Sequence, residues 1–128
     1  RDRGAQAAAT TRYSLPAVTG VVELRGHGTE LLGREAATVG GPCKGLDGFS
    51  EFYGGTPVVV TDQSGTTLAT GALDVGKVVD GSTCEFAFIV PDVPKAARYR
   101  FAVGGRTALD VSYDELAAGG WQATLALG

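Results

Sequence analysis

Residues 82–90 read Ser-Thr-Cys-Glu-Phe-Ala-Phe-Ile-Val, and this stretch decides the fold class. Every second position holds a cysteine or a large apolar residue: Cys84, Phe86, Phe88 and Val90. Glu85 and Ala87 stand between them. Because successive side chains of a β-strand point to opposite faces, this alternation predicts a strand with one buried face. Pro91 and Pro94 prevent its continuation as a central strand.

Similar short runs lie on both sides of this strand, separated by turn residues. The runs span residues 19–25, 56–61, 66–73, 98–103, 106–111 and 121–127. Asp62 to Gly65 and the pair Gly104-Gly105 have the chemistry of hairpin turns. Short strands at spacings of roughly 8–12 residues are typical of antiparallel sandwiches. The sequence therefore predicts an all-β, immunoglobulin-like or transthyretin-like sandwich of seven to eight strands.

Three segments depart from the strand pattern. Ser112 and Glu115 form a capping box, which predicts one short helical turn near 112–118. Residues 29–39 fit either a short helix or a strand near 36–39. Residues 40–55 contain Cys43 and are expected to form a loop, because glycine is frequent there and no regular alternation is visible.

The chain of 128 residues has the length of one domain. Residues 1–17 are polar, rich in alanine and threonine, and without periodicity, so we expect a flexible tail or linker. Residues 18–128 are expected to form a single β-sandwich domain. No apolar run approaches the ~20 residues that span a bilayer, so no transmembrane segment is expected in this chain.

The net charge of −3 and the pI near 5.0 disfavour nucleic acid as a partner, because phosphate-rich partners select basic surfaces. Basic residues cluster in two places, at Arg1, Arg3 and Arg12, and at Lys95, Arg98 and Arg100. Small clusters of this kind are usually solvated surface. We interpret the first cluster as a solvated tail and the second as the solvated face of a strand.

The sequence offers no catalytic residue, metal ligand set or cofactor motif. His27 is the one histidine and stands between glycines in a predicted turn, away from any serine or cysteine arrangement that needs a base. One histidine and two cysteines at scattered positions do not make a tetrahedral metal site. We therefore predict that the chain is not an enzyme and binds no cofactor or metal.

The loop after Cys43 is the one place where acidic and aromatic residues gather outside a predicted strand. Asp47, Glu51 and Tyr53 could form a binding patch there. The simpler interpretation is that Phe49 and Phe52 plug the core while the acidic residues cap the loop.

Two cysteines in a glycine-rich chain permit a single disulfide between Cys43 and Cys84, worth about 4 kcal/mol on a chain-entropy estimate. Two buried thiols, as in a reducing cytosol, are the alternative.

A further pattern links the two cysteines to the aromatic strands and covers residues 43–50, 58–71, 84–90, 99–103 and 111–116. Over these stretches the chain resembles a family of secreted or surface-anchored actinobacterial domains without established activity. A looser similarity to transthyretin-like and carboxypeptidase-regulatory-like sandwiches rests on the Phe-x-Phe-x-Val run before Val93-Pro94. The first resemblance implies an exported domain with a Cys43–Cys84 disulfide, secreted or anchored at the cell surface.

These features favour a non-catalytic extracytoplasmic module that acts by binding or as a structural part, with an unknown protein or cell-surface partner. An extracellular sensor or accessory domain of a membrane-anchored protein is the alternative. An enzyme with an unrecognised site ranks third.

Overall fold

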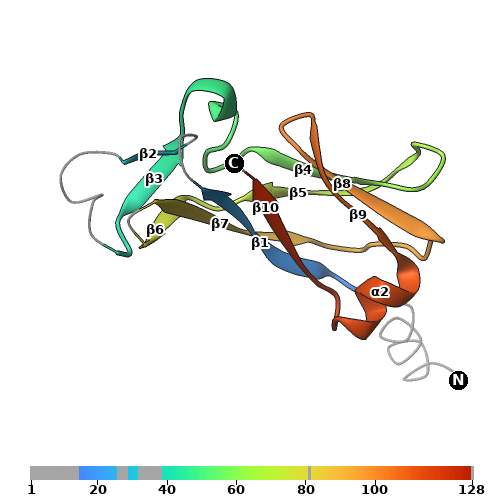
Figure 1. Cartoon of the computed structure of the whole chain (residues 1–128). Coiled ribbons are helices and arrows are strands. Elements are labelled where there is room, and N and C mark those ends of the chain that lie inside the picture. The colour runs from blue at the N-terminus through green and yellow to red at the C-terminus, as the bar shows by residue number, and fades with distance from the viewer. Residues whose placement is uncertain (1–14, 26–28, 32–38, 81, 128) are drawn as a thin grey trace, which may run out of the picture.

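The computed structural model describes residues 15–25, 29–31, 39–80 and 82–127. These ranges contain ten strands, one 3-10 helix and one short α-helix (Figure 1). The elements are β1 (Val18–Arg25), β2 (Thr29–Leu31), β3 (Pro42–Gly45), η3 (Asp47–Phe49), β4 (Pro57–Thr61), β5 (Thr67–Leu73), β6 (Gly76–Asp80), β7 (Thr83–Val90), β8 (Arg98–Val103), β9 (Arg106–Ser112), α2 (Tyr113–Ala118) and β10 (Gln122–Leu127).

All ten strands belong to one sheet, and β7 lies at its centre. β1 pairs antiparallel along the whole length of β7, and β6 and β5 share its other side. From β5 the sheet continues through β4 and β8 to β9, and from β6 through β3 to β2. β10 pairs with β1, and this pairing is parallel. Figure 1 shows that the sheet curls strongly into a half-barrel.

The all-β, mostly antiparallel prediction is confirmed, whereas the count of seven to eight strands was wrong. The strands that the sequence did not reveal are β2, β3 and β6. β3 holds four residues, one of them proline and one glycine, so it is too short for an alternation to stand out. It lies within the stretch predicted as a loop and pairs with β6 through Pro42 and Cys43. Of the ambiguous segment, Thr29 to Leu31 is a strand, and residues 32–38 lie outside the described residues.

The alternation in residues 82–90 has the predicted consequence. The inward residues of β7 are buried, and Ala87 and Ile89 point outward. The remaining large buried side chains of the core come from other strands of the sheet and, for Phe52, from the loop before β4: Val18, Val22, Leu24, Phe52, Val58, Val60, Val78, Tyr99, Phe101 and Leu125. The concave side of the curled sheet is therefore a continuous apolar core.

The predicted helical turn is confirmed. The Ser112 side chain accepts a hydrogen bond from the Glu115 backbone N–H at 3.1 Å, and the Glu115 carboxylate accepts one from the Ser112 N–H at 2.9 Å. This reciprocal cap starts α2, which ends before Gly119. α2 thereby carries the chain from β9 to β10.

Candidate functional site

The loop from Leu46 to Thr56, which contains the predicted binding patch, is folded onto itself. The Gly45 N–H donates to the Phe52 carbonyl at 2.8 Å, and the Thr56 hydroxyl donates to the Glu51 carbonyl at 2.5 Å. A Cβ atom at Gly45 would lie 1.9 Å from the Phe49 carbonyl oxygen, so this close approach requires glycine. The backbone of the loop is thus closed by its own hydrogen bonds.

Arg106, at the start of β9, holds the same loop from outside. Its Nε donates to Glu51 Oε2 at 3.1 Å, and a terminal nitrogen donates to the Gly48 carbonyl at 2.6 Å. The guanidinium also lies over the Phe49 ring, 4.6 Å from the ring centre. Arg106 therefore clamps the loop to the β8–β9 hairpin, and the clamp engages the Glu51 carboxylate.

The predicted patch of Asp47, Glu51 and Tyr53 stays a prediction. Glu51 is bound to Arg106, Tyr53 points outward and is 51% exposed, and the side chain of Asp47 lies outside what the structure describes. Phe52 is fully buried in the core, as the alternative interpretation expected. The geometry of the loop thus has a structural explanation that needs no ligand.

A second feature is an aromatic corner, the cluster of Tyr99, Tyr113 and Trp121 beside α2. The ring centres of Tyr113 and Trp121 are 5.5 Å apart, and those of Tyr99 and Trp121 are 6.3 Å apart. The Tyr99 hydroxyl donates to the Pro94 carbonyl at 2.9 Å and accepts from the Ala96 N–H at 3.1 Å. Burial raises the pKa of this phenol, so the Tyr99 hydroxyl stays protonated at neutral pH and can donate its hydrogen bond to Pro94.

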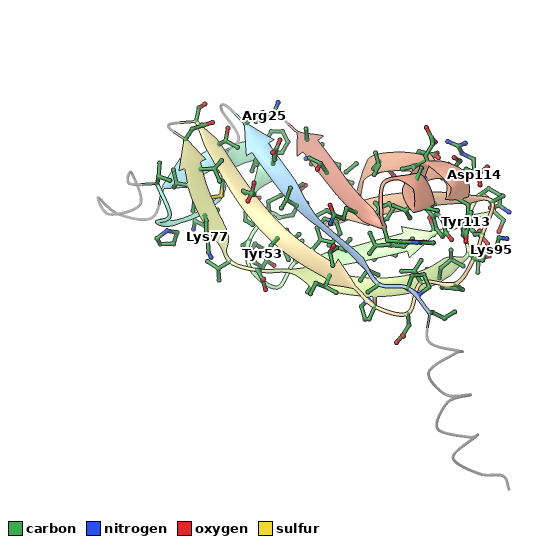
Figure 2. All side chains as sticks on the ribbon, turned by 90° about the horizontal axis from the view of Figure 1, so that it is seen from below. Arg25, Tyr53, Lys77, Lys95, Tyr113 and Asp114 are labelled. Carbon is green, nitrogen blue, oxygen red and sulfur yellow. A yellow bond between two sulfur atoms is a disulfide. The ribbon has the colours of Figure 1, made fainter. Side chains whose placement is uncertain are left out.

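An open cleft of about 570 Å³ lies at the outer side of this corner, where Lys95, Tyr113 and Asp114 are labelled in Figure 2. Lys95 Nζ lies 4.8 Å from the centre of the Tyr113 ring, a cation–π contact. Ser112, which also lines the cleft, is occupied by the helix cap. The Ser112 oxygen therefore has a structural role at the start of α2.

The basic strand face is partly neutralised. Arg98 Nε lies 3.0 Å from Asp110 Oδ1, and a terminal nitrogen of Arg100 lies 3.6 Å from Asp110 Oδ2. All three side chains are nearly half exposed, so these pairs are solvated and screened. Arg98 and Arg100 thus share one carboxylate and form no strong anion site.

The most distinctive surface lies on the convex side of the sheet, over β1, β7 and β5. The register of β7 with β1 and β5 places Ala87 beside Val21, and Ile89 between Thr19 of β1 and Ala72 of β5. Val75 lies in the two-residue connection between β5 and β6, close to Gly54, the neighbour of Tyr53: a Cβ atom at Gly54 would lie 3.1 Å from Val75 Cγ2. We call this surface the outer-face patch, and its members are Val21, Tyr53, Ala72, Val75, Ala87 and Ile89.

Its large side chains are unusually exposed: Ile89 by 59%, Val75 by 60% and Tyr53 by 51%. Charged residues border this surface: Lys77 pairs across the strands with Glu85, and Glu85 faces Glu23. The exposed Asp74 lies in the chain between Ala72 and Val75. Tyr53 and Lys77 are labelled in Figure 2. An apolar centre with a charged margin is the usual anatomy of a protein interface.

Sequence reasoning missed this patch although one signal was present. Ile89 occupies an outward position of β7, where a strand with one wetted face usually carries a polar residue. Val75 could not be placed, because it lies between β5 and β6, and β6 was not predicted from the sequence.

Other site types find no support in the described part of the chain. Within residues 15–25, 29–31, 39–80 and 82–127, no group of three histidine, cysteine or acidic side chains could hold a metal ion. The same ranges contain no helix long and apolar enough to cross a membrane. His27 lies outside the described residues.

Comparison with known proteins gives no match, whether with family models, with curated proteins or with solved structures.

Proposed function

We propose that this chain is a non-catalytic extracytoplasmic domain that binds a protein partner through the outer-face patch. The observation that carries the proposal is the outward exposure of Ile89 and Val75 on a strand face bordered by charged residues such as Lys77 and Glu85. Burying about half of each of these side chains against a partner would contribute roughly 1 kcal/mol each.

The extracytoplasmic location is supported by the Cys43–Cys84 disulfide, whose Cα atoms are 6.0 Å apart. Both cysteines are buried, so the bond is structural and not an exposed redox switch. Structural disulfides of this kind persist mainly in oxidising compartments.

We also propose a more specific fold class for the curled sheet. The group β10–β1–β7–β6–β3–β2 and the group β5–β4–β8–β9 enclose the core between them, and they meet where β5 pairs with β7. We infer that this half-barrel derives from an immunoglobulin-like or transthyretin-like sandwich whose two sheets are joined at one corner. The sensor or accessory role in a membrane-anchored protein is a second hypothesis that no contact in the structure favours over the first.

Site-specific photocrosslinking tests the binding role. A photoreactive residue replaces Ile89 in the full chain, and a matched protein carries the same residue at Thr107, which is exposed on β9. In cells that produce the protein, we expect one defined protein adduct from position 89 and none from position 107, because only position 89 lies in the patch. The Val75→Lys exchange should abolish the adduct, since a charge at the centre of the patch must be desolvated on binding.

Equal labelling from both positions, or an adduct insensitive to Val75→Lys, would show unspecific contact and overturn the proposal. Circular dichroism of each variant checks that the fold is intact. Both sites are exposed, so their stabilities should stay within about 0.5 kcal/mol of the parent.

A further inference from the structure

A separate surface, at the free edge of β10, points to another mode of binding. β10 pairs with β1, and no other described strand pairs with it. The Thr19 N–H donates to the Trp121 carbonyl at 3.1 Å. This bond shows which backbone groups of β10 point toward β1 in the parallel ladder. Alternate residues of a strand direct their N–H and C=O groups to opposite sides, so Gln122, Thr124 and Ala126 direct theirs away from β1.

This edge lacks the devices that normally prevent strand addition. β10 reads Gln-Ala-Thr-Leu-Ala-Leu, without a charge or a proline, and its ladder with β1 has no bulge. The edge strand β9, by contrast, carries Arg106 and Asp110 and has a bulge against β8. Exposed edges without charge, proline or bulge are ready templates for another strand.

The gap beside β10 is a groove with an apolar floor. It has a volume of about 300 Å³ and lies between β9, α2 and β10. Leu109 and Val111 face inward, opposite Phe101 and Tyr99, yet they are only partly buried. Such a groove fits an extended backbone that places apolar side chains at every second position on this floor.

The charged residues of the groove indicate which side chains a bound extended segment would carry at one of its ends. Asp110 and Glu115 line it near α2, and no lysine or arginine is among the lining residues. Arg98 and Arg100 already share the Asp110 carboxylate from the β8 side. Glu115 accepts from the Ser112 N–H and keeps further acceptor capacity, so Glu115 is the carboxylate here that favours a lysine or arginine in the ligand.

We propose that β10 receives an extended segment of a partner protein as an added strand, antiparallel to β10, with alternating apolar residues and a basic end beside α2. Backbone hydrogen bonds to the free edge would provide affinity, and the groove would provide selectivity for side chains. This inference does not depend on the outer-face patch, because it uses the edge of the sheet and not its convex face.

The test uses the full chain labelled with nitrogen-15 and the synthetic peptide Val-Thr-Val-Thr-Val-Lys-Lys as the probe. We expect saturable shifts of the amide signals of Gln122, Thr124 and Ala126 at peptide concentrations up to about 1 mM. A peptide N-methylated at alternate amides should bind at least about tenfold more weakly, because the ladder cannot form. A peptide ending in Glu-Glu should also bind more weakly.

Matched variants locate the site on the protein. Thr124→Pro removes an outward N–H and should weaken binding about tenfold, whereas Thr124→Val keeps the N–H and should bind like the parent. Equal binding of the N-methylated peptide, or no shift of the three amides, would overturn strand addition. Equal binding of the Glu-Glu peptide would overturn the basic end. Self-association that is lost in Thr124→Pro would assign the edge to a second copy of the chain and overturn the partner segment. The photocrosslinking at position 89 does not involve this edge, so the two proposals can fail independently.

Discussion

The two ends of the molecule are held together by different means. At one end β3 is tied to β7 by the Cys43–Cys84 disulfide. At the other end, beside α2, the aromatic corner packs Tyr99 against Tyr113 and Trp121 without a covalent link. Figure 1 shows β3 and α2 at opposite ends of the curled sheet.

The difference follows from how much pairing each end can form. β3 pairs with β6 through only two residue pairs and with the three-residue β2 on its other side. So short a ladder is marginal without a cross-link. The aromatic corner has three packed rings, a doubly bonded Tyr99 hydroxyl and a capped helix, so many weak contacts together replace one strong bond. Loss of the one disulfide should therefore destabilise the β3 end strongly, whereas loss of any single contact should destabilise the aromatic corner only slightly.

Removal of the disulfide should have the largest effect. We expect Cys43→Ala combined with Cys84→Ala to lower the free energy of unfolding by about 4 kcal/mol, because the unfolded chain gains the entropy of an open loop of this length. Urea unfolding measures the loss, and the parent protein in reductant is the control. Amide exchange should increase first in β3 and β6, while β8 and β9 keep their protection. A loss below about 1 kcal/mol would contradict the dependence of this end on one bond.

A smaller effect is expected from Tyr99→Phe, which removes one hydroxyl from the aromatic corner. The Pro94 carbonyl and the Ala96 N–H both lose a partner. We expect a loss of about 1–2 kcal/mol in the free energy of unfolding, measured in urea. Tyr53→Phe is the matched control, since Tyr53 is half exposed, and it should change stability by less than about 0.5 kcal/mol. Equal losses in both variants would show that the Tyr99 hydroxyl adds nothing to the corner.

The same contrast explains what the sequence could predict. β7 was evident, because every second residue from Cys84 to Val90 is a cysteine or a large apolar residue and the flanking turns contain glycine, aspartate or proline. The helix cap was evident as well, since Ser112 and Glu115 interact within four residues. β3 and β6 were missed because their pairing is specified by distant partners and by the disulfide, which leave no local periodicity.

The candidate sites were hard to predict for a related reason. Arg106 lies far along the chain from Glu51, so the clamp that engages this carboxylate has no local signature. The outer-face patch joins Tyr53, Val75 and Ile89 from separate segments, and it becomes visible only when the sheet is assembled.

The smallest predicted effect concerns pH, and it compares an aspartate turn at each end. Near the aromatic corner, the Asp62 carboxylate accepts from the Ser64 hydroxyl at 2.7 Å and from the backbone N–H groups of Ser64 and Thr66. At the disulfide end, Asp80 accepts from the Ser82 N–H at 2.9 Å. These hydrogen bonds lower the pKa of both carboxyls, led by the Ser64 side chain for Asp62 and by the Ser82 backbone for Asp80.

Since each pKa is lower in the folded than in the unfolded chain, both turns add stability above the ordinary pKa of aspartate and lose it as pH falls through the lowered value. We therefore expect Asp62→Asn and Asp80→Asn each to flatten the decline of unfolding free energy between about pH 5 and about pH 2, measured in urea. The change should be larger for Asp62, which accepts three hydrogen bonds, than for Asp80, which accepts one from the Ser82 N–H and a long one of 3.4 Å from the Ser82 hydroxyl. Asp114→Asn, at an exposed position of α2, is the control. If Asp80→Asn flattened the acid decline more than Asp62→Asn, the disulfide end would depend on its turn as well as on its bond, and the contrast between the two ends would have to be redrawn.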